Sequence, residues 1–341
     1  MGETLKRIIK DPERKSFLRM GMDLSRLLIK YKKVGRLQFY GTQLMYKKDA
    51  GKLNDYLPPQ IYRKFKRQNS NKWRDSGLND KLIFHDLMKK NNLPVPKYIG
   101  KIQNGCFYDE NNKKIPIENH DQLKTLIGNQ LKTVPDLFVK PSKSSQGKGI
   151  QRIKKDTLDK VSEIDFSKDY IIQETLQQHK SISKISPNCV NSLRVITYRK
   201  GNKTVIPSCH FVMGVGNDFL ANGNFGSIRI AYNIDTNTLG KVGYKGFKFG
   251  GTSYSAHPDT HFKFEGKGLI FTKEIKEIVT KAASLVFEGE LIGWDIAFTD
   301  KGPCIMEGNH SPGLTFPQIY SKGLLKNTSY FEIFNEFFKL E

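Results

Sequence analysis

Two apolar segments near the end of the chain limit its fold more than any other feature. Residues 291–299 and 303–309 are rich in strand-forming residues, and the turn-forming residues between them predict a β-hairpin. Each segment carries one carboxylate among apolar neighbours, Asp295 in the first and Glu307 in the second. A carboxylate inside an apolar strand is unfavourable unless it is paired or coordinated. The hairpin therefore predicts a sheet that holds a polar site.

Strand geometry groups these polar residues. Asp295 faces away from Trp294, whereas Glu307 and Asn309 share one face at a spacing of about 6.6–6.8 Å. Oxygen ligands from neighbouring strands suit Mg²⁺, which binds one or two carboxylates and keeps positions for water and substrate phosphates. The alternative is a hydrogen-bonded polar group at each strand end. The three residues together, in a chain with a candidate phosphate-binding loop, favour a metal site.

The candidate phosphate-binding loop follows an apolar strand that ends near Lys140. Residues 142–149 consist of Ser, Lys, Gln and Gly. Small residues let backbone N–H groups approach phosphate oxygens, and lysine supplies positive charge. The loop is not a P-loop, because the residues after it read as a strand and not as a helix. The alternative is an ordinary hairpin turn with solvated lysines.

Three further positions carry chemistry. Arg194 lies within an apolar strand, where a guanidinium needs an anion or many acceptors. A phosphate or acyl phosphate suits its bidentate geometry, and a structural salt bridge is the alternative. Gln173 ends a strand whose backbone can bind an adenine edge, although taken alone it reads as a plain strand end. Lys81 begins a helix expected over residues 81–91, and taken alone it reads as an exposed lysine.

The remaining pattern predicts an α+β fold with a basic helical N-terminal extension. Helical periodicity is expected at residues 3–32, 59–68, 273–288 and 327–339, and residues 188–245 read mainly as strands. The chain holds 22 Phe and 14 Tyr, enough to form a core, so intrinsic disorder is excluded. The apolar runs are shorter than the ~20 residues that a membrane-spanning helix needs.

Positive charge is concentrated at the start of the chain. The net charge is +22, and residues 1–75 contribute +13 of it. Nucleic-acid binding, attraction to an anionic membrane surface and recruitment of an acidic substrate all explain such a charge, as does ordinary solubility. The four scattered cysteines and the lack of a visible signal peptide favour a reducing cytoplasm.

In their order along the chain, these motifs resemble the ATP-grasp superfamily, including D-alanine–D-alanine ligases, over roughly residues 78–320. The motifs that carry the resemblance are Asn79-Asp80-Lys81-Leu82, Pro94-Val95-Pro96, Val139-Lys140-Pro141 with its loop, Ile171-Ile172-Gln173-Glu174, Asp295 and Glu307-x-Asn309. Finer similarity, to the sugar-transfer-associated ATP-grasp branch of polysaccharide gene clusters, rests on Ser192-Leu193-Arg194-Val195, on Gly293-Trp294-Asp295-Ile296-Ala297 and on residues 307–313.

The resemblance implies an ATP-grasp fold in which two α/β subdomains grip ATP. Residues 78–180 would form the N-terminal and small ATP-binding subdomains, residues 181–341 the C-terminal subdomain with the Mg²⁺ site, and residues 1–77 the basic extension. ATP and two Mg²⁺ ions are the implied cofactors. The implied site comprises catalytic Arg194 and Lys148, nucleotide-binding Lys81, Lys140, Ser144, Ser145, Gln146, Gly147, Gly149, Gln173, Glu174 and Leu176, and metal ligands Asp295, Glu307 and Asn309. The superfamily's usual ribose-binding acid has no clear counterpart, because Gln177, Gln178 and His179 occupy that stretch.

The implied activity is that of an ATP-dependent ligase that joins a carboxylate to an amine through an acyl phosphate. Its substrate would be a cell-surface polysaccharide or a precursor of one. A kinase that stops at phosphoryl transfer is the alternative within the superfamily. A nucleic-acid-binding protein would explain the charge but not the ordered motifs, so it is not favoured. The basic residues 1–75 are then expected to meet an acidic glycan or the anionic inner membrane surface, with the protein in the cytoplasm.

Overall fold

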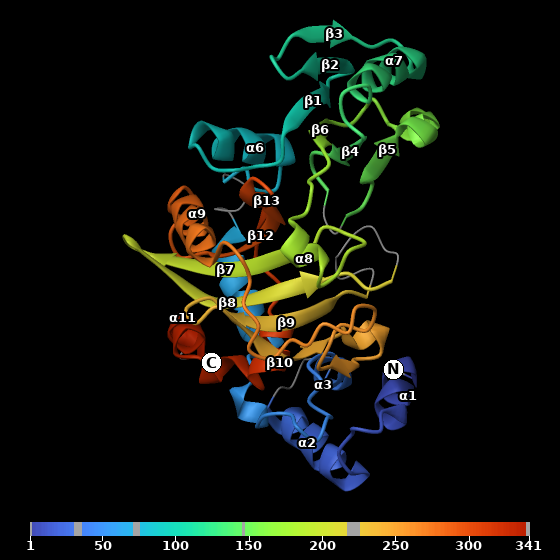
Figure 1. Ribbon diagram of the computed structural model, residues 1–341. Coiled ribbons are helices and arrows are strands. Elements are labelled where there is room, and N and C mark those ends of the chain that lie inside the picture. The colour runs from blue at the N-terminus through green and yellow to red at the C-terminus, as the bar shows by residue number, and fades with distance from the viewer. Residues whose placement is uncertain (1, 31–35, 71–75, 145–146, 217–225, 339–341) are drawn as a thin grey trace.

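The computed structural model describes residues 2–30, 36–70, 76–144, 147–216 and 226–338. It contains a six-stranded and a seven-stranded antiparallel sheet, with helices packed against both. The six-stranded sheet lies at one end of an elongated molecule, the seven-stranded sheet in the middle, and the N-terminal helices at the opposite end (Figure 1). The expected α+β fold is therefore confirmed.

The small sheet has the strand order β3-β2-β1-β6-β4-β5. Its strands are β1 (Tyr98–Gln103), β2 (Cys106–Asp109), β3 (Lys114–Pro116), β4 (Asp136–Pro141), β5 (Gln151–Lys154) and β6 (Tyr170–Glu174). Helix α7 (His120–Gln130) and the 3-10 helix η2 (Lys155–Glu163) share its hydrophobic core. The core lies between this helical layer and the sheet. The loop after β4 lies at the end of the small sheet that faces the large sheet (Figure 1).

The large sheet has the strand order β11-β10-β9-β8-β7-β12-β13. Its strands are β7 (Ser192–Lys200), β8 (Lys203–Met213), β9 (Ile228–Asn233), β10 (Thr238–Tyr244), β11 (Ser253–Tyr254), β12 (Leu291–Thr299) and β13 (Gly302–His310). Strands β12 and β13 form the hairpin predicted from the sequence. Helices α6 (Lys81–Lys90) and α9 (Thr272–Ser284) contribute to the largest core, which contains fully buried Trp294. The alternation of β12 sends Asp295 to the other face, as its sequence pattern predicts.

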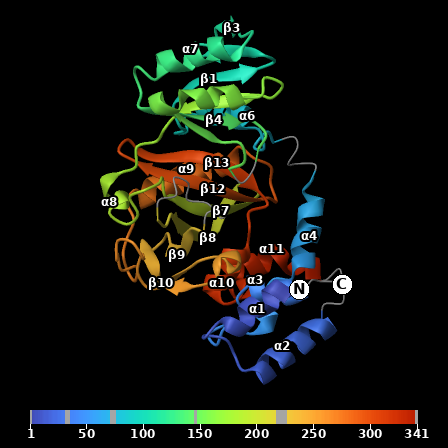
Figure 2. The same ribbon diagram turned by 90° about the vertical axis from the view of Figure 1, so that its right-hand side faces the viewer.

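The opposite face of the large sheet is partly covered by C-terminal and N-terminal helices. The remaining C-terminal elements are α8 (Lys180–Ser183), η3 (Phe247–Phe249), α10 (Thr315–Ser321), η4 (Leu324–Lys326) and α11 (Thr328–Phe338). Helix α4 (Pro59–Gln68) packs on α11, where Phe65 lies 5.3 Å from Phe334 between ring centroids. Figure 2 shows α4 beside α11. The N-terminal extension is thus joined to the body of the large sheet through a shared core.

The first 30 residues form two helices and not the single helix expected from their periodicity. Helix α1 (Gly2–Lys10) and helix α2 (Phe17–Lys30) are separated by residues 11–16. Pro12 lies in this break, and a proline there removes a helical donor and clashes with the preceding turn. Helix α3 (Arg36–Thr42) and the short η1 (Leu53–Asp55) complete the extension.

Candidate functional site

Four polar side chains form a row across four neighbouring strands of the large sheet. Glu307 on β13 pairs with Asp295 on β12, Asp295 with Arg194 on β7, and Arg194 with His210 on β8. Residues directly opposite each other on neighbouring strands share one face. The two carboxylates and the arginine that the sequence singled out are therefore brought together by strand register.

Arg194 and Asp295 form a two-point ion pair. Arg194 Nη2 donates to Asp295 Oδ2 at 2.7 Å, and Arg194 Nε donates to Asp295 Oδ1. Gly293 leaves the room this pair needs, because a Cβ there would lie 2.9 Å from Arg194 Nη1 and 2.8 Å from Pro312 Cβ. The salt bridge that the sequence left as an alternative for Arg194 is thus present, and its partner is the predicted metal ligand.

The carboxylates face each other in a site with little solvent. Asp295 is 9% exposed, and burial together with the facing Glu307 raises its pKa to about 6 against the attraction of Arg194. Burial raises the pKa of Glu307 as well, but a hydrogen bond from Asn309 and the nearby Arg194 and Lys81 outweigh it, so that pKa lies below its ordinary value. Asn309 Nδ2 donates to Glu307 Oε1 at 2.9 Å. The arrangement leaves carboxylate repulsion that a further cation would relieve.

These residues fit a divalent cation of the Mg²⁺ type. Glu307 and Asp295 supply carboxylates from paired strands, and Asn309 keeps its side-chain carbonyl oxygen while its amide group donates to Glu307. Within the described residues there is no group of three or more His, Cys, Asp and Glu side chains arranged to hold a metal. A site here therefore depends on the amide oxygen of Asn309 and on ligands from a substrate phosphate or water.

Lys81 connects the start of α6 to the loop after β4. Asp80 caps the helix by accepting from the N–H of Leu82 at 2.9 Å. The Lys81 N–H donates to the carbonyl of Ser142 at 2.9 Å, and its Nζ donates to the carbonyl of Ser144 at 2.6 Å. Burial lowers the pKa of Lys81, although the nearby Glu307 raises it. The predicted nucleotide-binding lysine therefore lies between the loop and the carboxylates.

Lys140 enters the same electrostatic environment from the small sheet. Its Nζ donates to Gln173 Oε1 on the neighbouring strand β6 at 2.9 Å. Burial lowers the pKa of Lys140 to about 8, partly offset by Glu307 and reinforced by Lys81. The interaction with Glu307 couples a lysine of one sheet to a carboxylate of the other. Cationic groups of the small sheet and anionic groups of the large sheet thus face a common region.

The rest of the predicted phosphate loop is described only in part. Ser144, Gly147, Lys148 and Gly149 lie within the described residues, whereas Ser145 and Gln146 lie outside them. Gly147 and Gly149 have φ values of +75° and +71°, which suit glycine in a tight turn. Lys148 is exposed, and among the described residues it makes no hydrogen bond or ion pair with Arg194. The structure therefore does not bring the two predicted catalytic residues together.

The predicted adenine hinge leaves the small sheet at the end of β6. Gln173 is buried, whereas Glu174 is partly exposed and lies 3.3 Å from Lys97 in an ion pair. Leu176, after the strand, is partly buried. In the stretch without a ribose-binding acid, Gln178 Oε1 accepts from the backbone N–H of Asn191 at 2.7 Å. The Gln178 side chain thus stabilises the segment that precedes β7.

Sequence reasoning missed two basic groups near Arg194: His210, which is buried, and Arg229, which is partly buried and pairs with Val212 of β8. Arg229 on β9 lies over the Phe316 ring at 4.1 Å, and burial together with Arg194 lowers its pKa to about 10. Burial and the nearby Arg229 and Arg194 lower the pKa of His210 well below its ordinary value. Arg229 stands between two isoleucines in a predicted strand, the same signal that identified Arg194. His210 carried no comparable signal.

The His310 side chain is buried, with only 3% of it exposed. Its Nδ1 lies 3.0 Å from Glu290 Oε2, and its Nε2 is hydrogen-bonded to Ser76 Oγ at 2.5 Å. These contacts join the end of β13 to the residue before β12 and to residues before α6. The His310 ring therefore anchors the end of β13, the strand that carries Glu307 and Asn309.

Comparison with known proteins identifies one family. A family model described as sugar-transfer associated ATP-grasp matches residues 161–332, half of the chain. This range contains Arg194, Asp295, Glu307 and Asn309. No match is found among curated proteins.

Solved structures give distant matches. The chain is similar to D-alanyl-alanine synthetase A from Vibrio cholerae (16% identity, TM-score 0.43), with 76% of this chain and 65% of that chain covered. It is also similar to the N5-carboxyaminoimidazole ribonucleotide synthetase purK in an ADP complex (13% identity, TM-score 0.43), with coverage of 70% and 46%. A third match is the ATP-grasp ligase PsnB complexed with a precursor variant, Mg and ADP (14% identity, TM-score 0.43), with coverage of 78% and 60%. The chain thus spans about half to two thirds of these proteins.

Proposed function

Because the chain belongs to the sugar-transfer associated ATP-grasp family, we propose that it is an ATP-dependent ligase that joins a carboxylate to an amine. A carboxylate oxygen of the first substrate attacks the γ-phosphorus of ATP, ADP leaves, and an acyl phosphate forms. The amine then attacks the acyl carbon, inorganic phosphate leaves with the bonding electron pair, and the amine proton is released. Such chemistry needs positioning and charge neutralisation and no protein nucleophile.

One observation carries the proposal. The Glu307–Asp295–Arg194 row on the large sheet shares its electrostatic environment with Lys81 and Lys140, which come from α6 and the small sheet. Anionic ligands for a cation and cationic groups for phosphates are therefore arranged on two sides of one region. This pairing supports the binding of a nucleotide triphosphate together with a divalent cation.

The roles proposed for single residues follow from this arrangement. Asp295, Glu307 and Asn309 would hold Mg²⁺, as one ion or two, which would neutralise charge on the transferring phosphoryl group. Lys81 and Lys140 would contact the phosphates, and Arg194 would hold Asp295 in position and face the phosphoryl group. Lys148 would approach only with the loop that contains it, since it is exposed.

The remaining proposed nucleotide contacts surround the base and the phosphates. The backbone near Gln173, Glu174 and Leu176 would bind adenine. The loop residues Ser144, Ser145, Gln146, Gly147 and Gly149 would cover the phosphates. The lysine–glutamine hydrogen bond between Lys140 and Gln173 supports this division, because it joins the adenine hinge to a phosphate-binding lysine.

An anionic acceptor is supported by the cations beyond Arg194. Arg229 packs over Phe316 instead of over a carboxylate, and its charge adds to that of Arg194. We propose that this part of the sheet receives the acid substrate, and that the acid belongs to a cell-surface polysaccharide or its precursor. The family description supports a link to sugar transfer. The proposed location is the reducing cytoplasm, in keeping with four free cysteines.

The basic residues 1–75 are proposed to dock on an anionic partner, either an acidic glycan or the inner membrane surface. Their net charge of +13 supports long-range attraction to such a partner. None of the described helices is both long enough and apolar enough to cross a bilayer. Nucleic acid is not favoured as the partner, because the ordered nucleotide-site motifs account for the rest of the chain.

The proposed activity can be tested by product analysis. The protein is incubated with Mg²⁺, ATP and panels of uronic acids and amines, and ADP, phosphate and amide are measured. ADP with free phosphate and an amide supports the ligase, whereas ADP with a stable phosphorylated product identifies a kinase. Glu307→Gln should abolish turnover while the protein remains folded. Turnover equal to that of the wild type would overturn the proposed metal site.

A further inference from the structure

Exposed apolar side chains are concentrated on the first two helices. Among the described residues, ten large apolar side chains are exposed, and seven of them belong to α1 and α2. We call these seven the apolar patch; they are Leu5, Ile9, Phe17, Leu18, Met22, Leu28 and Ile29. Single exposed apolar residues are ordinary, whereas a group of this kind marks an interaction surface.

Helix α2 has two apolar sides. Leu18 is 78% exposed and Ile29 80%, and at 100° per residue both project within about 40° of Met22. Met20 and Leu27 lie on the other side and are only 6% and 1% exposed, because they pack against the body of the protein. The outward side is therefore not needed for the core, and it leaves aliphatic side chains in water.

Cations border the apolar patch. On α2, Arg19 and Arg26 are exposed and lie along one edge of the outward side. They also line a cavity of about 480 Å³, together with Lys15, Lys52 and the single acidic residue Asp23, so basic residues outnumber acidic ones there. On α1, Lys6 and Lys10 each follow directly after a member of the patch. The size and charge of the cavity suit an anionic headgroup.

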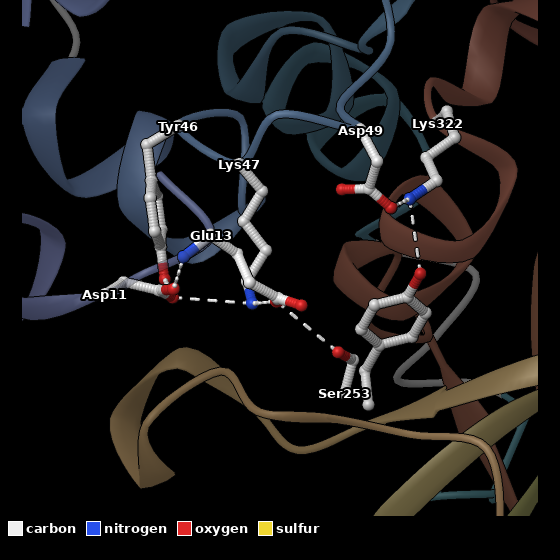
Figure 3. Close-up of polar contacts among 8 residues, drawn as sticks. Asp11, Glu13, Tyr46, Lys47, Asp49, Ser253 and Lys322 are labelled. Carbon is white, nitrogen blue, oxygen red and sulfur yellow. Dashed lines mark hydrogen bonds and ion pairs between the residues drawn. The ribbon is translucent and has the colours of Figure 1, made fainter. Parts of the chain in front are cut away.

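The acidic residues of the same segment form ion pairs within the protein. Glu3 pairs with Arg7 at 2.6 Å, and Asp23 pairs with Lys15 at 2.8 Å. Asp11 and Glu13 both pair with Lys47 (Figure 3). The cations at the edge of the patch therefore present a net positive field to an approaching surface.

Buried polar contacts hold this segment on the rest of the protein. Lys47 is 4% exposed at its side chain and lies between Asp11 and Glu13, while Tyr46 Oη donates to Asp11 at 2.9 Å. Glu13 also accepts from Ser253 of β11 at 3.5 Å (Figure 3). Nearby, Lys322 pairs with Asp49 and donates to Tyr244 Oη at 3.2 Å. The break between α1 and α2 is thus fixed to the large-sheet body, so the patch is a face of the folded protein.

We propose that the apolar patch binds the surface of an anionic lipid bilayer, with Leu18 and Ile29 entering the interface and the bordering cations contacting headgroups. This inference rests on the docking role proposed above and chooses between its two partners. Helices with an apolar outer side bordered by Lys and Arg lie in the membrane interface. An acidic glycan would use the cations but would give aliphatic side chains no contact of comparable value. A second copy of this chain would bring together two surfaces of equal positive sign.

The proposed docking has a consequence for orientation. Helix α2 lies at the end of the molecule opposite to the small sheet in both views (Figures 1 and 2). A protein bound through the apolar patch would hold the small sheet and its lysines away from the bilayer. The nucleotide would then enter from the aqueous side while the protein stays at the membrane.

Vesicle flotation of the full chain, without ATP, tests the proposal. Vesicles of phosphatidylcholine alone are compared with an equal mixture of phosphatidylcholine and phosphatidylglycerol. The double variant Leu18→Glu/Ile29→Glu should bind the anionic vesicles at least about tenfold more weakly, since two apolar side chains no longer enter the interface. Phe331→Glu, at an exposed apolar residue of α11, is the matched control and should bind as the wild type does. Leu18→Ser/Ile29→Ser repeats the test without added negative charge.

The charge contribution is measured separately. Arg26→Gln should lower the partition coefficient about fivefold, the value of one cation near an anionic surface, whereas Lys273→Gln on α9 should leave it unchanged. Equal binding to both vesicle types, or undiminished binding of the Leu18/Ile29 variants, would overturn the proposal. A dimer that is seen in sedimentation and dissociates in the Leu18/Ile29 variants would also overturn it. So would binding to polygalacturonate that these variants weaken as much as they weaken binding to vesicles. ATP turnover without vesicles is assayed in parallel, so loss of the proposed ligase activity is distinguished from loss of lipid binding.

Discussion

Replacing Asp295 with asparagine should remove one contribution to the pH dependence of the free energy of unfolding of the metal-free protein. Burial and the facing Glu307 raise the pKa of Asp295 from 3.8 to about 6 in the folded state. The folded state therefore holds this proton more tightly than the unfolded chain does. Its stability falls as pH rises from about 3.8 through about 6, and the loss is complete above that range.

The size of this effect follows from the shift itself. Each pKa unit corresponds to 1.36 kcal/mol, so the shift of Asp295 corresponds to about 3 kcal/mol. The asparagine side chain does not titrate, so the stability of Asp295→Asn relative to the wild type should rise by about 2.4 kcal/mol between pH 4 and pH 7.5, because part of the titration lies below pH 4. The attraction between Arg194 and ionised Asp295 is already contained in this pKa, so it is not counted a second time.

Urea unfolding in EDTA at several pH values measures this difference. Asp136→Asn, at another buried carboxylate paired with an arginine, Arg152, is the matched control for the loss of such a pair. A difference between Asp295→Asn and the wild type that is flat or falls with pH would refute the reasoning. ATP turnover should be lost in Asp295→Asn, so a variant that is relatively more stable at neutral pH would also be inactive.

Three further predictions concern other parts of the protein. Since the pKa of Lys140 is about 8, ATP affinity should fall as pH rises through that value, and calorimetric titration of Lys140→Met should find weak affinity without this pH dependence. Gly293→Ala should destabilise the protein by about 1–3 kcal/mol through overpacking and lower turnover, whereas Gly313→Ala, with nothing within 4 Å of the new Cβ, should do neither. Lys47→Met should lower the free energy of unfolding by about 3–5 kcal/mol because two carboxylates lose their buried partner, and exposed Lys48→Met should not; equal denaturation midpoints would contradict this.

Local sequence patterns determined the elements that carry the site. Period-2 alternation around Asp295 predicted both the β12–β13 hairpin and the face of each polar side chain, because strand geometry depends on neighbouring residues alone. The order of short motifs predicted the family, and the matching family model confirms that prediction. The assignments of single site residues to nucleotide and metal stay predictions.

These local patterns could not predict contacts between segments that are distant in the sequence. Arg194 and Asp295 are separated by 101 residues, and only the register of β7 against β12 shows that they pair with each other. Arg229 lies two strands away from Arg194, opposite Val212 of β8, and Lys81 reaches Ser144 across 63 residues. Sequence spacing does not encode such approaches, because they depend on how separately formed elements pack.

The N-terminal extension shows the same division most clearly. The sequence alone determined that residues 1–75 carry excess positive charge and that the first segment has helical periodicity. It could not tell Leu27, which is 1% exposed, from Ile29, which is 80% exposed, since both are aliphatic residues of one helix. Only the tertiary structure decided which side of α2 is buried, because burial depends on where the helix rests on the body. That choice is the basis of the docking surface proposed above.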